Sequence, residues 1–193
     1  MRIMNVKKVM IIFLIIGTLT VVSGCARWPD GPGPGPGETE YQLEITVEVS
    51  GIIDSNNGIY YIVIDADGNS ATGPGYDISF WDDKFYYIQL EGGFFYFAQK
   101  EEGSPQLYLA NSLISGNTIQ VTIALSDLED PNSIDINVLT TDSDNNTYDH
   151  LDSYFTINTT MLGATGEGVI SGGGTGGTDF DITKVTAVIT TLY

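Results

Sequence analysis

The sequence predicts an all-β fold, an antiparallel β-sandwich of the jelly-roll or immunoglobulin-like kind, over residues 41–193. Three observations predict it: strand-like segments recur about every ten residues, turn-forming residues separate them, and no segment has a convincing helical period. Residues 41–50 alternate apolar and polar side chains, as in a strand with one buried face. Residues 58–65 form a continuous apolar run, which predicts a central strand.

The remaining elements are predicted from the residue types along the rest of the chain. Further strands are expected at residues 76–81, 84–90, 93–99, 106–110, 117–125, 134–140, 153–158 and 182–192. Residues 84–99 are expected to form a hairpin around Glu91-Gly92-Gly93. Residues 126–130 predict one helical turn capped by Ser126. Residues 163–177 contain eight glycines and predict a mobile loop before the last strand.

Composition excludes several functions. The chain has 193 residues, of which 25 are acidic and seven basic, giving a formal net charge of −18. Nucleic-acid binding needs a basic surface, so no nucleic-acid partner is expected. One Cys excludes a disulfide framework, and one His excludes a multi-histidine metal centre. No nucleophile–base pair can be proposed, so the sequence predicts a protein that is not an enzyme.

The amino-terminal residues indicate export. Residues 1–24 combine basic residues with an apolar stretch at 9–22 that is too short for a permanent membrane helix, which needs about 20 residues. The following Val22-Ser23-Gly24-Cys25 resembles the lipobox of bacterial lipoproteins. The resemblance implies cleavage before Cys25, acylation of this residue, and an extracytoplasmic protein anchored by acyl chains to the cell membrane or outer membrane. The alternatives are a signal peptide with a chance Cys and an uncleaved signal anchor.

Residues 25–40 are expected to be a linker. Alternating Gly and Pro at 31–37 prevent a helix or a strand, because Pro removes backbone donors and Gly removes side chains. The predicted organisation is therefore a signal peptide at 1–24, a lipidated Cys with its tether at 25–40, and the sandwich at 41–193.

Two acidic clusters at strand ends have the oxygen donors that Ca²⁺ prefers. Alternate donors stand at Asp65, Asp67 and Asn69, and again at Asp142, Asp144 and Asn146. Each run supplies three or four of the six to eight oxygens that Ca²⁺ needs. The alternative is that Asp and Asn simply form turns at strand ends.

Aromatic residues are concentrated between residues 60 and 97. Adjacent strand residues face opposite sides, so one aromatic face is expected to be core and the other to be an exposed surface for recognition, such as sugar stacking. The residues predicted to bind such a ligand are Trp81, Tyr86 and Tyr96. The alternative is that both faces are covered, in which case the protein is a structural or protein-interaction lipoprotein of the envelope.

A second resemblance concerns the domain itself. Residues 62–69, Ile-Val-Ile-Asp-Ala-Asp-Gly-Asn, followed by Thr72-Gly73, resemble a segment of DOMON and family 9 carbohydrate-binding-module-like sandwiches. Residues 124–128 and 134–142, with Asp149 beyond, resemble the late strands of that group. The resemblance covers residues 58–158 and implies a sandwich that binds sugars or, in some relatives, haem.

Overall fold

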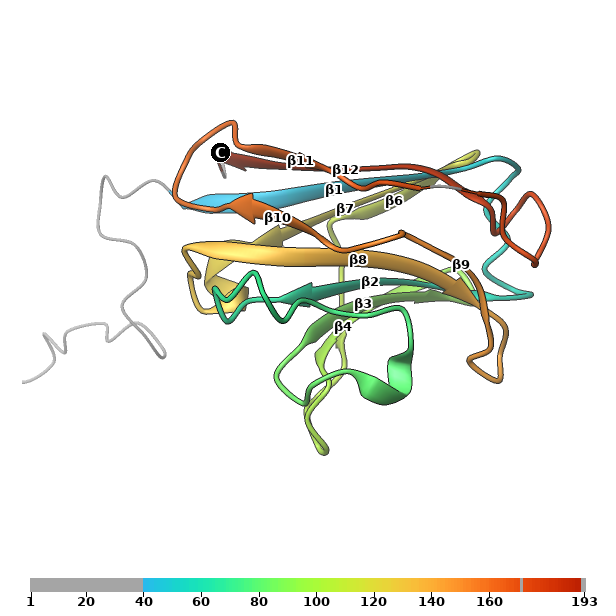
Figure 1. The fold of residues 1–193 in the computed structure, drawn as a ribbon, viewed down its shortest axis with the longest axis horizontal. Coiled ribbons are helices and arrows are strands. Elements are labelled where there is room, and N and C mark those ends of the chain that lie inside the picture. Colours follow the sequence, from blue (N-terminus) through green and yellow to red (C-terminus); the bar gives the residue numbers. More distant parts are fainter. Residues whose placement is uncertain (1–39, 171, 192–193) are drawn as a thin grey trace, which may run out of the picture. The chain divides into compact units, whose positions relative to one another are not determined.

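The structure is a computed structural model that describes residues 40–191 except residue 171. The described residues form two antiparallel sheets (Figure 1), which confirms the predicted all-β sandwich. The five-stranded sheet has the order β11-β12-β1-β7-β6. The seven-stranded sheet has the order β10-β8-β2-β3-β4-β5, and β9 also pairs with β8. The predicted signal peptide, Cys25 and nearly all of the linker lie outside the described residues.

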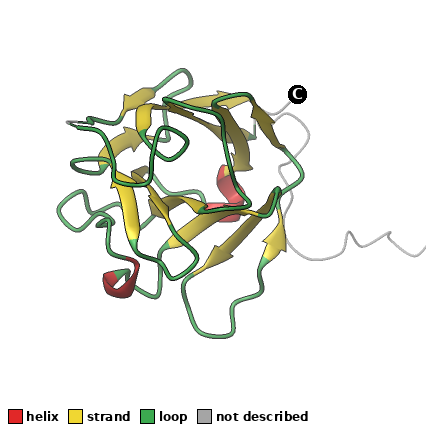
Figure 2. Cartoon of the chain, turned by 90° about the vertical axis from the view of Figure 1, so that its right-hand side faces the viewer, coloured by secondary structure: helices red, strands yellow, loops and turns green. Residues whose placement is uncertain are grey.

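The strands are two to ten residues long. The five-stranded sheet contains β1 (Tyr41–Val49), β6 (Ser112–Ser115), β7 (Thr118–Ala124), β11 (Thr165–Glu167) and β12 (Ile182–Thr191). The seven-stranded sheet contains β2 (Ile59–Asp65), β3 (Tyr86–Glu91), β4 (Phe94–Gln99), β5 (Leu107–Tyr108), β8 (Ser133–Thr141), β9 (Thr147–His150) and β10 (Phe155–Asn158). Figure 2 looks along the strands and shows the loops that join them, with two short 3-10 turns, η1 (Ile78–Phe80) and η2 (Leu125–Leu128). Among the described residues, no helix has the length and apolar character needed to cross a membrane.

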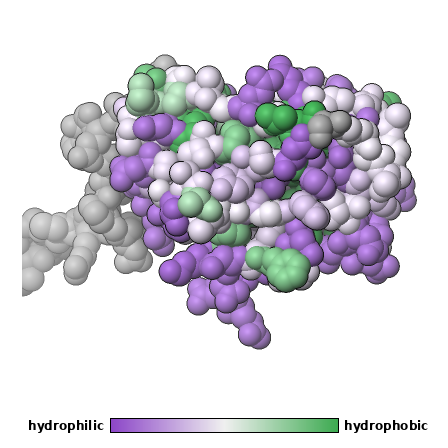
Figure 3. Space-filling view, viewed as in Figure 1, coloured by the Kyte–Doolittle hydropathy of each residue, from purple (hydrophilic) through white to green (hydrophobic). Residues whose placement is uncertain are grey.

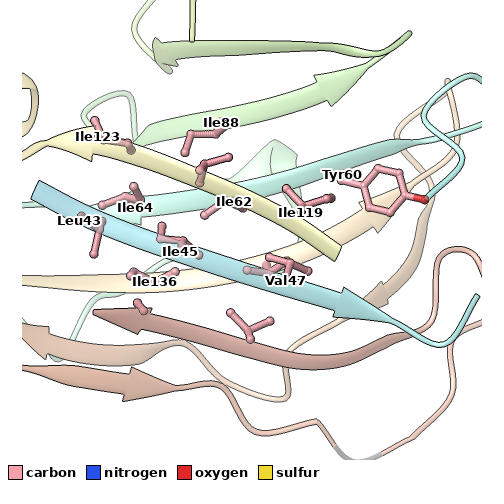
Figure 4. Close-up of a cluster of buried hydrophobic side chains, with 14 of the residues drawn as sticks. Leu43, Ile45, Val47, Tyr60, Ile62, Ile64, Ile88, Ile119, Ile123 and Ile136 are labelled. Carbon is pink, nitrogen blue, oxygen red and sulfur yellow. The ribbon is translucent and has the colours of Figure 1, made fainter. Parts of the chain in front are cut away.

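The main core lies between the two sheets and is built by alternation. Every second residue of β1 from Leu43 is buried, as the sequence pattern predicted. Inward-facing side chains of both sheets meet in Figure 4, which labels Leu43, Ile45, Val47, Tyr60, Ile62, Ile64, Ile88, Ile119, Ile123 and Ile136. Strand β2 is buried along its whole length, which confirms that it is a central strand.

The predicted hairpin at residues 84–99 is confirmed. Strands β3 and β4 pair from Tyr86–Gln99 to Glu91–Phe94, with Gly92 and Gly93 between them. Both glycines have positive φ, 57° and 83°, which is the conformation that a two-residue hairpin turn needs.

Four local predictions were wrong or incomplete. Residues 76–81 are not a strand but contain η1, because this segment has no strand partner and instead crosses the outer face of the seven-stranded sheet. Ser126 does not cap η2, since the cap residue is Ala124 and the Ser126 hydroxyl donates to Glu40 instead. Strands β6, β9 and β11 were not predicted.

The fourth concerns the glycine-rich segment at 163–177, which contains strand β11 rather than being loop throughout. Its glycines lie against bulky side chains. A Cβ on Gly168 would stand 2.6 Å from Leu151, and one on Gly176 would stand 2.4 Å from the Tyr148 ring. Val169 also forms an isolated antiparallel bridge with Ser153. Glycine is needed here for close approach of the backbone to side chains.

Candidate functional site

Part of the outer face of the seven-stranded sheet is covered by the connection between β2 and β3, residues 66–85. Trp81 from this connection packs on Tyr61, with ring centroids 5.6 Å apart in an edge-to-face arrangement. The Trp81 side chain is only 6% exposed, and its indole Nε1 donates to the Gly75 carbonyl at 2.8 Å. These two residues belong to a second core cluster that also contains Ile59, Val63, Phe85 and Leu139. The connection therefore acts as a structural cover on this half of the sheet.

The other half of the same face exposes aromatic rings. Phe95 and Phe97 of β4 point into the main core, so Phe94 and Tyr96 lie on the outer face. Tyr108 of β5 pairs with Tyr96 and shares its face. Phe94 is 54% exposed and Tyr108 is 65% exposed, while Tyr96 is half-buried. We call Phe94, Tyr96 and Tyr108 the aromatic strip.

Polar side chains flank the aromatic strip on β3. Gln89 is the cross-strand partner of Tyr96, and Glu91 is the partner of Phe94. The Gln89 side-chain amide donates to the Glu91 carboxylate at 2.7 Å, which leaves further donor and acceptor positions on both groups. Figure 3 shows one face of the molecule, on which hydrophobic residues form separate patches among polar ones. The strip thus combines flat apolar surfaces with hydrogen-bonding groups.

The structure does not bring together the three residues predicted to bind a ligand. Tyr96 lies in the aromatic strip, whereas Trp81 is buried under the cover. Tyr86 lies on the opposite face of β3, where its ring stacks on Phe97 at 5.7 Å and burial raises the pKa of its hydroxyl. Of the three, Tyr96 alone adjoins exposed aromatic rings on the outer face.

A pocket of about 300 Å³ lies between the carboxyl end of β2 and the covering connection. Asp65, Asp67 and Asp82 line it together with Lys84. We call this the acidic pocket. Asp65 is 3% exposed, and its Oδ1 accepts a hydrogen bond from the Asp67 backbone amide at 3.0 Å. Its Oδ2 is buried and has no hydrogen-bond partner among the described residues.

Several neighbours disfavour the charged form of Asp65. Burial raises its pKa to about 6, and the nearby carboxylates of Asp67, Asp135 and Asp82 act in the same direction. Asp135 stands directly across from Asp65 on β8 and is equally buried, with the Thr156 hydroxyl donating to it. Burial also raises the pKa of Asp135. Ionisation of Asp65 and Asp135 would therefore place negative charge where little water can reach it.

The second acidic cluster is a hairpin turn between β8 and β9. Asp142 Oδ1 accepts hydrogen bonds from the backbone amides of Asp144 and Asn146, at 2.9 and 2.8 Å. The Asn146 side-chain amide donates to Oδ2 at 2.8 Å. The two hydrogen bonds from Asn146 hold the pKa of the Asp142 carboxyl below its usual range. In this turn both carboxylate oxygens of Asp142 already have partners.

Neither predicted set is arranged as a complete metal site. Among the described residues, no three His, Cys, Asp or Glu side chains are gathered so that they could hold a metal ion. Asn69 lies outside the lining of the acidic pocket, and its Oδ1 accepts from the Ala71 amide at 3.3 Å. His150 stacks on Tyr76 with ring centroids 4.2 Å apart.

Three site residues were missed by sequence reasoning: Phe94, Tyr108 and Asp82. Phe94 could have been chosen, because it alternates with the buried residues of β4. Tyr108 could not, because its place depends on the pairing of β5 with β4. Asp82 lies far along the covering connection from Asp65, and only folding brings it to the pocket.

Comparisons of the chain with protein-family models, with curated proteins and with solved structures found no match.

Proposed function

We propose that this protein is a non-catalytic, lipid-anchored binding protein whose aromatic strip binds carbohydrate outside the cytoplasm. The observation that carries the proposal is the exposure of Phe94 and Tyr108 on one face of the sheet, beside Gln89 and Glu91. Exposed aromatic surface commonly marks a recognition site. A ring can pack on the C–H face of a sugar, while amide and carboxylate groups bind its hydroxyls.

The anchor is proposed from Val22-Ser23-Gly24-Cys25, with acyl chains on Cys25 holding the protein to a membrane. The acidic chain would be repelled by anionic lipid headgroups, so its own surface gives no attachment. A tether of Gly and Pro between Cys25 and the sandwich would let the strip reach glycans away from the lipid surface.

The second candidate function is a structural or protein-interaction role in the cell envelope without a small-molecule ligand. The burial of Trp81 favours it, because this large ring packs on Tyr61 rather than facing solvent. Under this alternative the aromatic residues serve mainly to hold the cover in place.

A glycan array probed with the full-length protein in detergent micelles separates the two candidates. We expect binding to at least one glycan class. Phe94→Ala and Tyr108→Ala should each weaken that binding by about tenfold, which is the loss of about 1.4 kcal/mol expected when one stacking contact is removed. Phe80→Ala is the matched control, because Phe80 is 84% exposed and lies on η1, outside the strip. Absence of binding to every glycan would favour the structural role, and an equal loss in the control would show that the glycan does not bind at the aromatic strip.

Intact-mass analysis of the protein from membranes tests the anchor. We expect residues 1–24 to be missing and acyl chains to be attached to Cys25, and Cys25→Ser should release the protein from the membrane fraction. An unmodified thiol on a chain that still carries residues 1–24 would contradict the anchor while leaving the glycan proposal standing.

A further inference from the structure

The acidic pocket draws carboxylates from three separate parts of the chain. Asp65 ends β2, Asp67 and Asp82 belong to the covering connection, and Asp135 faces Asp65 from β8. The like charges of Asp67, Asp135 and Asp82 repel that of Asp65, and the repulsion from Asp67 is the largest of the three. A bound cation would remove the repulsion.

The Asp65 Oδ2 atom has no partner among the described residues, and it therefore lacks a donor or a cation. A buried acceptor without a partner is costly, and the cost is higher when the group is charged. The other oxygen of Asp65 is already used by the Asp67 amide, so Oδ2 is the free one, and Asp65 lines the pocket. The partner it lacks must therefore be supplied from the pocket.

We propose that the acidic pocket binds one Ca²⁺ ion through Asp65, Asp67 and Asp82, with Asp135 adding negative charge behind Asp65. Carboxylates are hard oxygen ligands, and Ca²⁺ accepts an irregular set of them more readily than Mg²⁺, which demands octahedral geometry. This site differs from a contiguous loop of residues 65, 67 and 69, because Asn69 lies outside the pocket and Asp82 takes its place.

Loading requires two side chains to move. Asp67 and Asp82 are exposed, and each uses one oxygen to accept from a backbone amide two residues ahead, Asn69 at 2.6 Å and Lys84 at 3.0 Å. The second oxygen of each is free to turn toward Asp65 Oδ2. Lys84 also lines the pocket.

The proposed ion would join β2 to the connection that covers the sheet. Asp82 is adjacent to Trp81, whose ring packs on the second core cluster. Bound Ca²⁺ should therefore stabilise the cover as well as the pocket, because a ligand that binds only the folded state raises its stability.

The test uses the full-length protein in detergent, treated with EDTA and then exchanged into chelator-free buffer. Calcium titration followed by calorimetry should show one site and a rise in Tm of several degrees. Terbium, a luminescent substitute for calcium, should emit when Trp81 is excited. Asp67→Asn and Asp82→Asn should each weaken calcium binding by at least about tenfold, the scale of loss seen when support of a metal ligand is removed. Asp144→Asn is the charge-matched control from the other acidic turn and should bind calcium normally.

Two results would overturn the proposal. The first is a wild-type protein with neither a calcium-dependent rise in Tm nor terbium emission. The second is a calcium site that survives Asp82→Asn or is lost in Asp144→Asn, since either places the ion elsewhere. Lys84→Met should tighten calcium binding if the ammonium group competes for the pocket, and weaker binding would show that Lys84 supports the site instead.

Discussion

The turns at residues 65–69 and 142–146 both follow a strand and both place Asp, Asp and Asn at alternate positions. Their backbones are also alike. In each, the first Asp accepts from the amide two residues ahead, and the fourth residue, Gly68 or Asn145, has a positive φ of 76° or 64°. Yet Asp65 is buried with a raised pKa, and Asp142 is only half-buried with a lowered one. The local pattern determines the turn, whereas the surrounding elements determine the charge state.

The largest expected effect comes from removing the cover over the first turn. Trp81→Ala should reduce the free energy of unfolding by about 3–5 kcal/mol, because a fully packed ring is lost and a cavity is left. The loosened connection should also let water reach Asp65, so its pKa should fall toward that of an exposed Asp. Chemical denaturation gives the first quantity and an NMR titration gives the second. Trp81→Phe, which keeps a ring but loses the bond to Gly75, should lose less stability.

A smaller effect is expected from Asp65→Asn in the presence of EDTA. Because folding raises the Asp65 pKa to about 6, the protonated form favours the folded state. This contribution is complete below the ordinary Asp pKa and is lost as the pH rises through about 6. Neutral Asn avoids the loss, so the variant should gain up to about 3 kcal/mol over the wild type between pH 4 and pH 7. Urea melts at both pH values measure it, and a constant difference between the proteins would contradict the assignment.

Gly73→Ala should act on the same cover through the backbone. A Cβ at this position would stand 2.5 Å from the Tyr154 ring, whose hydroxyl donates to the Ser70 carbonyl at 2.9 Å. Because this overlap forces the connection away from Tyr154, a loss of about 1–3 kcal/mol is expected in denaturant melts. Gly75→Ala is the control, since a Cβ there meets nothing within 4 Å.

The smallest effect is expected at the second turn. Asp142→Asn removes the charge that strengthens three hydrogen bonds in an exposed hairpin, so Tm should fall slightly at neutral pH. Because folding lowers the Asp142 pKa, its contribution is present above the ordinary Asp pKa and is lost as the pH falls through the folded value. Differential scanning calorimetry should therefore show the two proteins converging under strongly acidic conditions. If Asp142→Asn instead raised Tm at pH 7, the charge of Asp142 would be unfavourable in the folded state, as that of Asp65 is, and the contrast between the two turns would be wrong.

The sequence was sufficient for those parts of the fold that depend on local alternation. The period of two in β1, the apolar run of β2 and the Gly92-Gly93 turn each reveal their structure directly. Residues 76–81 were misassigned because the apolar residues of a covering segment resemble those of a strand. Only the pairing partners show that this segment packs on a sheet and does not join one.

The candidate site depends on contacts that sequence patterns do not contain. The burial of Asp65 follows from its place opposite Asp135 and beneath the covering connection. The exposure of Phe94 and Tyr108 follows from the covering connection, which packs on β2 and β8 and leaves the outer face of β4 and β5 open. The residue types predicted oxygen ligands and aromatic surface only as classes, and both remain predictions, whereas the placement of these residues depends on the three-dimensional pairing.

The strands at the edges of both sheets are short, and this affects how copies of the domain associate at high concentration. In the described residues, β6 and β11 border one sheet, and β5, β9 and β10 border the other, and none exceeds four residues. Long unpaired borders are templates on which a neighbouring molecule can extend a sheet, and short ones offer too few backbone groups for this. Many copies of this domain should therefore be able to stand side by side at high density without polymerising into fibres.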